Sequence, residues 1–175
     1  MLIRDMTRQA SMELLTRVRL FRLACAHEGQ PYITPIHCAY ASNYLYSFSR
    51  LGKKITWMRA NPLVCVEAEE LVSRQDWATV IVSGRYEELP DTPEYEAGRT
   101  HAYELLQRRP VWWEPGYMKT KLSDNADPME VVYFRIHVDQ VSGHCGVPDP
   151  VSGRELSAPE GWLRRILRRP EHKQG

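Results

Sequence analysis

The chain has 175 residues, of which 43% are hydrophobic, and a formal net charge of +1. A chain of this length can bury one good core, and its nearly neutral charge gives no sign of a nucleic-acid partner. No apolar run approaches the roughly 20 residues that cross a bilayer, and residues 1–5 lack the apolar stretch of a secretory signal. We therefore expect a cytoplasmic protein without a membrane partner.

The first half predicts a helix followed by antiparallel strands. Ser11 can cap that helix, and its apolar stripe is Leu14, Leu15 and Val18. Breaks at Glu28-Gly29 and Ser42-Asn43 are typical of hairpin turns. Strands are expected near residues 20–27, 32–39, 44–49, 63–69 and 77–88.

The second half continues this pattern. Thr92-Pro93 is typical of a helix start, and the helix is expected to run to about Gln107. A long loop over residues 108–128 precedes a sixth strand at 131–141. Six strands with a few helices predict a mainly β (α+β) fold with a small closed antiparallel sheet.

The four cysteines show no CxxC spacing: Cys25, Cys38, Cys65 and Cys145. Three of them lie in apolar, strand-like runs, where a free thiol packs as a small hydrophobic side chain. Structural disulfides are therefore not expected. Convergence of His37-Cys38 and His144-Cys145 on a zinc ion is the less favoured alternative, because these pairs lack the usual ligand spacing.

Residues 44–62 combine a strand, a turn with hydroxyl groups and a helix that starts with two lysines. Lys53 and Lys54 fall in the first helical turn, where the positive end of the helix dipole repels them. A phosphate would reverse this cost, because free N–H groups, two ammonium groups and the hydroxyls of Ser47 and Ser49 can together hold a phosphomonoester. The stretch predicts an anion pocket. A solvated lysine pair in a surface turn is the alternative.

Four stretches follow one another in an order that resembles a known family: RLACAHEGQPYITPIHCAY, LYSFSRLGKKI, MRANPLVCVE and WATVIVSGRYEEL. They resemble the pyridoxamine 5'-phosphate oxidase-like, FMN-binding split-barrel superfamily, in its branch of flavin-nucleotide-binding and nitroimidazole-resistance-like proteins. The resemblance covers residues 13–143. It implies a six-stranded antiparallel split β-barrel with flanking helices, which forms a homodimer and binds FMN in two equivalent sites along the subunit interface.

The resemblance assigns roles to residues around the predicted anion pocket. Lys53 and Lys54 match the basic pair that grips the FMN phosphate in the family. Tyr46 and Ser47 match the strand dipeptide that lies along the ribityl chain or the flavin. Ser49 follows in the phosphate turn.

A second group of residues is matched to the flavin ring. Pro35, Ile36, His37 and Cys38 correspond to the strand whose backbone runs beside the isoalloxazine ring. Thr79 stands where family members offer a hydrogen-bonding side chain to that ring. The resemblance thus implies cofactor contacts from two separate parts of the sequence.

Two departures from the family narrow the expected activity. Pyridoxamine-phosphate oxidases carry an Arg-Leu-His-Asp-Arg run after the last barrel strand, whereas Arg135-Ile136-His137 aligns with the strand before that run. Nothing equivalent follows Gly146, so a true vitamin B6 oxidase is not expected. Nitroimidazole-resistance relatives often have histidine where this chain has Ser47, so chemistry at that histidine is not expected either.

The sequence therefore predicts an FMN-dependent oxidoreductase that acts on an unidentified small molecule with NAD(P)H, and no catalytic residue is assigned. One alternative is a flavin storage or sensor module without turnover. Another is a haem-binding relative in which a histidine such as His144 ligates iron. Replacement of FMN by the deazaflavin F420 stays open.

Two further segments, a loop and a C-terminal extension, are also given expected roles. We expect the loop over residues 108–121, with Trp112 and Trp113, to wall the substrate side of the flavin; filling of the dimer core is the alternative. Residues 151–175 are expected to extend a split-barrel domain of residues 1–150. This extension contains a basic amphipathic helix near 159–169 that would dock on the core or on the partner subunit.

Overall fold

The computed structural model describes residues 1–109 and 131–147. The predicted loop around Trp112 and Trp113 and the predicted extension at 151–175 lie outside these residues. In chain order the elements are β1 (Leu2–Asp5), α1 (Arg8–Arg17), β2 (Phe21–His27), β3 (Gln30–Ile36), β4 (Cys38–Ala41), β5 (Tyr44–Arg50), α2 (Lys53–Ala60), β6 (Leu63–Ser73), β7 (Asp76–Leu89), the 3₁₀ helix η1 (Pro93–Tyr95), α3 (Glu96–Gln107) and β8 (Val131–Val147).

The strands form one antiparallel sheet in the order β3-β2-β6-β7-β8-β5-β4, and β1 pairs with β8. The two outermost strands, β3 and β4, are consecutive in the chain, with only His37 between them. The chain therefore leaves one edge of the sheet and enters the other edge at once, which is possible only because the sheet curls. This arrangement is that of a split barrel, and the predicted mainly β fold is confirmed.

The described residues contain eight strands rather than the expected six. The single strand predicted at 32–39 is divided at His37, where the chain passes between the two edges of the sheet. The other extra strand, Leu2–Asp5, pairs with the end of β8. All four of its residues are exposed, so it lacks the alternation of buried and exposed side chains that predicts a strand.

The first helix begins four residues earlier than predicted. The hydroxyl oxygen of Thr7 accepts a hydrogen bond from the backbone N–H of Ala10 at 3.1 Å, which is the geometry of an N-terminal cap. Ser11 is instead buried inside the helix and donates its hydroxyl to the Thr7 carbonyl oxygen at 3.0 Å. The prediction of Ser11 as the cap is wrong, because Thr7 is better placed for the first free N–H groups.

Both predicted hairpin turns are confirmed. Glu28 and Gly29 connect β2 to β3 with φ angles of 50° and 77°. Ser42 and Asn43 connect β4 to β5 with φ angles of 49° and 67°. These left-handed conformations are those of tight two-residue hairpins, which explains why Gly and Asn occur there.

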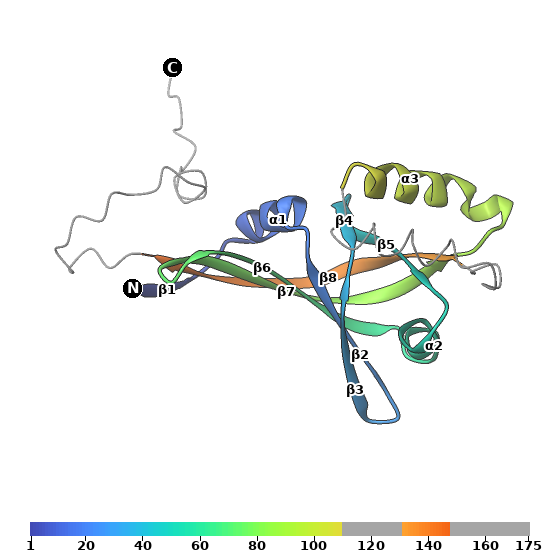
Figure 1. Ribbon diagram of the computed structural model, residues 1–175, viewed down its shortest axis with the longest axis horizontal. Helices are drawn as coiled ribbons and strands as arrows, with labels where there is room; N and C mark the ends of the chain where they lie inside the picture. The colour runs from blue at the N-terminus through green and yellow to red at the C-terminus, as the bar shows by residue number, and fades with distance from the viewer. Residues whose placement is uncertain (110–130, 148–175) are drawn as a thin grey trace, which may run out of the picture.

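Figure 1 shows that the sheet has two parts, a barrel and an extension to one side of it that we call the arm. The arm consists of β1 with the adjoining parts of β6, β7 and β8, and α1 lies against it. Helix α3 lies over β4 and β5, and α2 lies beside the β2–β3 hairpin. No helix in the two described ranges is long and apolar enough to cross a membrane.

The main core lies between the inner faces of the strands and the two helices α1 and α2. Its largest fully buried side chains include Phe21, Phe134, Leu14, Leu23 and Met58. Burial of each such side chain contributes about 1.5–3 kcal/mol. A smaller cluster of Tyr46, Leu89 and Ala102 fixes α3 on the barrel. The core thus holds α2 in a fixed position at one end of the barrel.

Candidate functional site

The N-terminus of α2 is an open, positively charged end of a helix. Gly52 precedes the helix and provides no side chain to accept hydrogen bonds from the first-turn N–H groups. Apart from Gly52 and its two neighbours in the chain, none of the described residues has an atom within 4 Å of the position that a Cβ on Gly52 would take. The first-turn N–H groups and the helix dipole together favour an anion at such an end.

Lys54 in this first turn is the side chain best placed for an anion. It is half-buried, and burial lowers the pKa of its ammonium group, while the nearby thiols of Cys38 and Cys25 act in the opposite direction. None of the ion pairs between described residues includes Lys54. A cation that loses water without gaining a carboxylate is expected to gain stability from a bound anion.

Lys53 lies differently from its neighbour. Its side chain is exposed, and its Nζ atom stands 4.3 Å from the ring centroid of Trp57 and 4.9 Å from that of Tyr32. These are cation–π contacts, which stabilise an exposed pair by about 0.5–1 kcal/mol. The two lysines that the sequence predicts as one phosphate-binding pair therefore differ in their present contacts.

The predicted serine ligands are engaged with the backbone. Ser47 is fully buried, and its hydroxyl donates to the carbonyl oxygen of His37 at 2.7 Å. The hydroxyl of Ser49 donates to the carbonyl oxygen of Arg50 at 2.9 Å. Both hydroxyl hydrogens are thus taken by carbonyl groups, so donation from either serine to a phosphate requires a rearrangement and stays a prediction.

Residues 35–38 lie at the seam between the two edges of the sheet. Pro35 is exposed, whereas Ile36, His37 and Cys38 are buried. The His37 ring has its Nε2 atom 3.4 Å from the carbonyl oxygen of Leu106 in α3. Burial raises the pKa of the Cys38 thiol to about 12, so this thiol stays protonated and unreactive at neutral pH.

Tyr46 and Ser47 point to opposite faces of β5, as neighbours in a strand must. The Tyr46 ring is buried in the small cluster under α3, with its centroid 5.2 Å from that of His101 in an edge-to-face contact. Ser47 instead faces Cys38, its partner across β4 and β5. The two side chains therefore do not contact one ligand together, and only the backbone of this dipeptide is shared.

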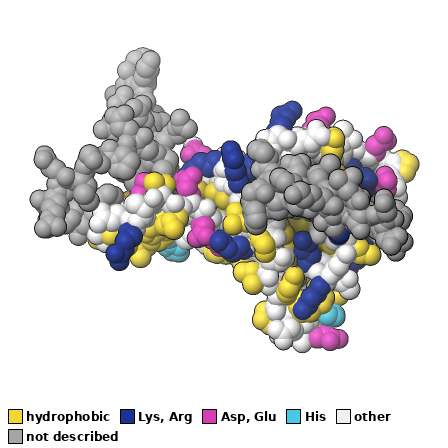
Figure 2. All heavy atoms as spheres, viewed as in Figure 1, with side chains coloured by type: hydrophobic (Ala, Val, Ile, Leu, Met, Phe, Trp, Pro, Cys, Tyr) yellow, Lys and Arg dark blue, Asp and Glu magenta, His cyan; other side chains and the backbone are white. Residues whose placement is uncertain are grey.

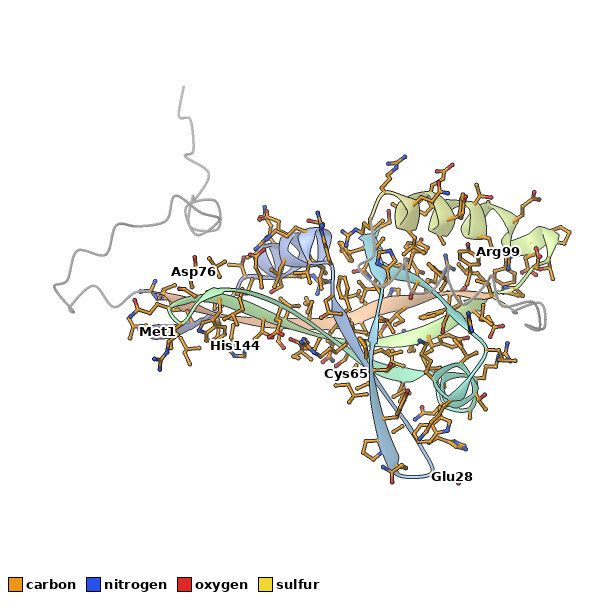
Figure 3. All side chains as sticks on the ribbon, viewed as in Figure 1. Met1, Glu28, Cys65, Asp76, Arg99 and His144 are labelled. Carbon is orange, nitrogen blue, oxygen red and sulfur yellow. The ribbon has the colours of Figure 1, made fainter. Side chains whose placement is uncertain are left out.

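Thr79 lies on the arm, away from α2. It faces Glu69 in β6 and His144 in β8 across the sheet, and its hydroxyl donates to the Glu67 carboxylate at 3.3 Å. Figure 3 shows His144 on the arm, whereas Glu28 lies far from it at the tip of the β2–β3 hairpin. Within one chain the structure brings together Lys54, Cys38 and Ser47 but leaves Thr79 apart.

The histidine considered for haem or metal binding is exposed on the arm. The Nε2 atom of His144 lies 3.3 Å from a carboxylate oxygen of Asp5. In the described parts of the chain, no three His, Cys, Asp or Glu side chains are grouped so that they could hold a metal ion.

Sequence reasoning missed a group of rings beside α2. His27 ends β2, Tyr32 lies in β3, and Trp57 stands one helical turn after Lys53 in α2. The ring centroids of Trp57 lie 5.8 Å from those of both His27 and Tyr32. The spacing of four residues between Lys53 and Trp57 is a signal that could have found this contact, because such residues share a helix face.

Comparison with known proteins identifies the family. The family model described as pyridoxamine 5'-phosphate oxidase matches residues 7–145, from the N-cap of α1 into the last part of β8. The chain belongs to this family. The resemblance stated from the sequence is thereby confirmed.

Individual relatives agree with this assignment. The chain is 40% identical over 145 residues to the uncharacterized protein RA0666 of Rhizobium meliloti (strain 1021), covering 83% of this chain and 96% of that protein. A solved structure, the FAD-binding protein mll6688 of Mesorhizobium loti, is 43% identical with a TM-score of 0.70, and the match covers 83% of this chain and 99% of that one. A structure described as a 5-nitroimidazole antibiotic resistance protein of Bacteroides thetaiotaomicron shares the fold, with a TM-score of 0.60, 18% identity and coverage of 83% and 89%.

Proposed function

We propose that this protein binds a flavin nucleotide through the open N-terminus of α2 and works as a flavin-dependent oxidoreductase. The observation that carries the proposal is Lys54, a half-buried ammonium without a carboxylate partner among the described residues. A phosphate group satisfies this ammonium and the first-turn N–H groups together. The relative from Mesorhizobium loti, which is 43% identical, is described as FAD-binding, and this supports a flavin as the ligand.

The residues present fit the riboflavin phosphate unit that FMN and FAD share. Lys54 and the first-turn N–H groups hold the phosphate, and Lys53 can leave its rings to add a second charge. The backbone of residues 35–38 lies at the seam of the barrel, where it can run beside a planar ring. Thr79 lies on a different part of the surface, which is what a flavin held between two subunits requires.

In the proposed activity a bound flavin would supply the redox chemistry, the transfer of a hydride from NAD(P)H to a small molecule. The chain holds the flavin phosphate, shields one side of the ring and shapes the cleft for the acceptor. No acid or base is assigned, because a hydride transfer needs positioning more than proton transfer. A homodimer completes each site in this proposal, since Thr79 of one subunit would reach the flavin of the other.

The test is flavin binding by the purified protein and by Lys54→Ala. Loss of one charge-assisted contact costs about 1.5–3 kcal/mol, so flavin affinity should fall about ten- to a hundredfold. Arg74→Ala, an exposed cation in the β6–β7 turn, is the matched control and should bind like the wild type. If Lys54→Ala bound flavin as tightly as the wild type does, the flavin phosphate would have to bind elsewhere. Flavin that is bound but never bleached by NADH or NADPH would favour storage or sensing over turnover.

A further inference from the structure

The strongest unassigned feature is the ring group beside α2, which we call the aromatic cluster: His27, Tyr32 and Trp57. It joins three elements, since the rings come from the end of β2, the middle of β3 and the last half of α2. The Tyr32 and Trp57 rings meet edge to face at 68°, and the His27 ring is tilted by 51° to the indole. All three side chains are half-buried, so parts of their faces stay accessible.

Lys53 links this cluster to the phosphate end of α2. It is in the first turn, and Trp57 stands four residues further along, a rise of about 6 Å. The Lys53 ammonium lies over both Trp57 and Tyr32, although Lys54 beside it is half-buried and unpaired within the described residues. A second phosphate next to Lys54 would give Lys53 a stronger partner than the rings, because charge-assisted contacts exceed exposed cation–π contacts.

We propose that the aromatic cluster is an adenine subsite that adjoins the flavin phosphate site, so that the protein prefers FAD to FMN. The inference rests on the proposed flavin site and extends it. FAD differs from FMN by a second phosphate, a ribose and an adenine, which are the groups that Lys53 and the cluster can recognise. Adenine is planar and stacks on Trp and Tyr rings in a way that does not depend on hydrogen-bonding partners.

The surroundings of the cluster agree with this chemistry. Figure 2 shows lysine or arginine and histidine atoms among hydrophobic surface in the part of the molecule where the β2–β3 hairpin and α2 lie. The carboxylate of Glu28 lies 3.9 Å from the His27 Nε2 atom and is itself highly exposed. It can turn away from an incoming diphosphate at little cost. The adenosine diphosphate group also occurs in NAD(P)H, so the experiment must separate the two sources.

The experiment titrates apo-protein with FAD and with FMN and follows flavin fluorescence. The wild type should bind FAD at least about tenfold more tightly than FMN. Trp57→Ala should weaken FAD binding about tenfold, as expected for one lost stacking contact, and change FMN binding less than about twofold. Trp57→Phe should keep most of the preference. Tyr103→Ala, an exposed aromatic of α3, is the matched control and should change neither affinity.

His27→Ala is the second variant, since it removes a ring at the edge of the cluster and keeps the test valid if Trp57→Ala does not fold. It should lower the FAD preference with FMN binding intact. Equal affinities of the wild type for FAD and FMN, or equal losses for both flavins in the variants, would overturn the inference. Weaker NADH binding to FMN-loaded Trp57→Ala with unchanged FAD affinity would overturn it too, in favour of a nicotinamide dinucleotide. Failure of the wild type to bind either flavin would instead refute the proposed function.

Discussion

At the scale of single residues, the most consequential side chains are two cations that meet no carboxylate among residues 1–109 and 131–147. Lys54 is one, and Arg109 is another. Arg109 donates to the carbonyl oxygens of Cys38 at 3.1 Å, of Val18 at 2.8 Å and of Thr16. Two of these carbonyls belong to the C-terminal end of α1, where the helix dipole favours a cation. The two cations therefore have different roles. Lys54 belongs to the candidate site at the N-terminus of α2, whereas Arg109 stabilises the fold at the C-terminal end of α1.

Replacing Arg109 by alanine should destabilise the fold by about 2 kcal/mol or more, because three carbonyl groups lose a charged donor. Arg109→Lys should recover part of this loss, since a lysine keeps the charge but cannot reach all three oxygens. Urea denaturation measures both. Arg74→Ala in the β6–β7 turn is the control and should leave the midpoint unchanged. If Arg109→Ala had the same urea midpoint as the wild type, water would be hydrogen-bonding the three carbonyl oxygens as well as Arg109 does, and the prediction would be wrong.

A second residue-scale prediction concerns pH. Arg59, with help from Tyr86, holds the pKa of the Glu88 carboxyl below its ordinary value of 4.5, although partial burial opposes this. Since the folded-state pKa is depressed, the stability from this contact is present above pH 4.5 and is lost as the pH falls through the lower folded value. In urea titrations between neutral pH and about pH 3, Glu88→Gln should therefore lose less stability on acidification than the wild type. Glu104→Gln, an exposed carboxylate of α3, should keep the wild-type slope; identical slopes for all three proteins would contradict the assignment.

At the scale of elements, the long β7–β8 pair depends on a bulge. The register shifts between Ser83 and Gly84, so that no residue of β7 lies opposite Asp139 in the strand pairing. At this point the two backbones approach closely. A Cβ on Gly84 would stand 2.2 Å from the carbonyl oxygen of His137 and 2.9 Å from the Ile136 side chain. The bulge bends the strands where the barrel continues into the arm, and only glycine fits there.

Gly84→Ala should therefore destabilise the protein by about 1–3 kcal/mol or more, the usual cost of overpacking. Gly98→Ala in α3 is the matched control, because its added Cβ would lie at an ordinary 3.5 Å from Leu89. Alanine favours helix by up to about 1 kcal/mol over glycine, so this control should be neutral or stabilising. Thermal unfolding compares the two. Equal effects of the same sign would show that the close approach at Gly84 relaxes freely.

The elements also show what the sequence could and could not predict. Strand alternation and turn residues predicted β2, β5 and β7 closely, and the stretch 44–62 predicted α2, because these signals are local. The strand at Leu2–Asp5 and the extension of β8 to Val147 are not predicted, because β1 forms only by pairing with β8, and the extension forms by pairing with both β1 and β7. The predicted sixth strand ends at residue 141, whereas β8 continues through Gly143 to Val147.

The features of the candidate site likewise differ in whether a local sequence pattern predicts them. The position of Lys54 follows from its place in the first turn of a helix, which the sequence shows. The engagement of Ser47 with His37 depends on the β4–β5 register and on the passage of the chain at the seam, which no local pattern gives. The cation–π contacts of Lys53 are predictable only in part. Trp57 shares its helix face, which the sequence shows, but Tyr32 comes from β3 and is brought there by the fold.

At the scale of the whole molecule, most of the large exposed hydrophobic side chains of the described residues gather in two places. One is the arm, where Met1, Leu2, Ile3, Leu71 and Val72 are exposed and where Figure 2 shows hydrophobic atoms along the surface. The other is the outer face of β3, β2, β6 and β7. A groove of about 510 Å³ crosses this outer face, floored by small side chains such as Ala24, Cys65 and Ser83. Around it stand Ile33 and Leu63, both 64% exposed, and Ile81.

This outer face is the one we expect a second copy of the chain to cover. Small side chains let another sheet approach closely, and two large side chains that are mostly exposed are costly to leave in water. Pro31 and Pro35 on the edge strand β3 discourage pairing by strand addition, because each removes a backbone donor. Contact through the face rather than through the edge is therefore favoured. Such a contact would also bring Thr79 of one subunit toward the seam of the other.

The last prediction is that the double variant Ile33→Glu, Leu63→Glu is a folded monomer that has lost flavin. Two buried charges without partners would disfavour the dimer by several kcal/mol, whereas both positions are exposed in the single chain and should not affect its folding. Size-exclusion chromatography with light scattering gives the mass, and circular dichroism checks the fold. Tyr103→Glu, an equally non-conservative change at an exposed position of α3, should remain dimeric with its flavin. A wild-type protein that is already monomeric at micromolar concentration with flavin bound would show that one subunit suffices. A double variant that stays dimeric would place the interface on another surface, and the exposed arm would then be the next one to test.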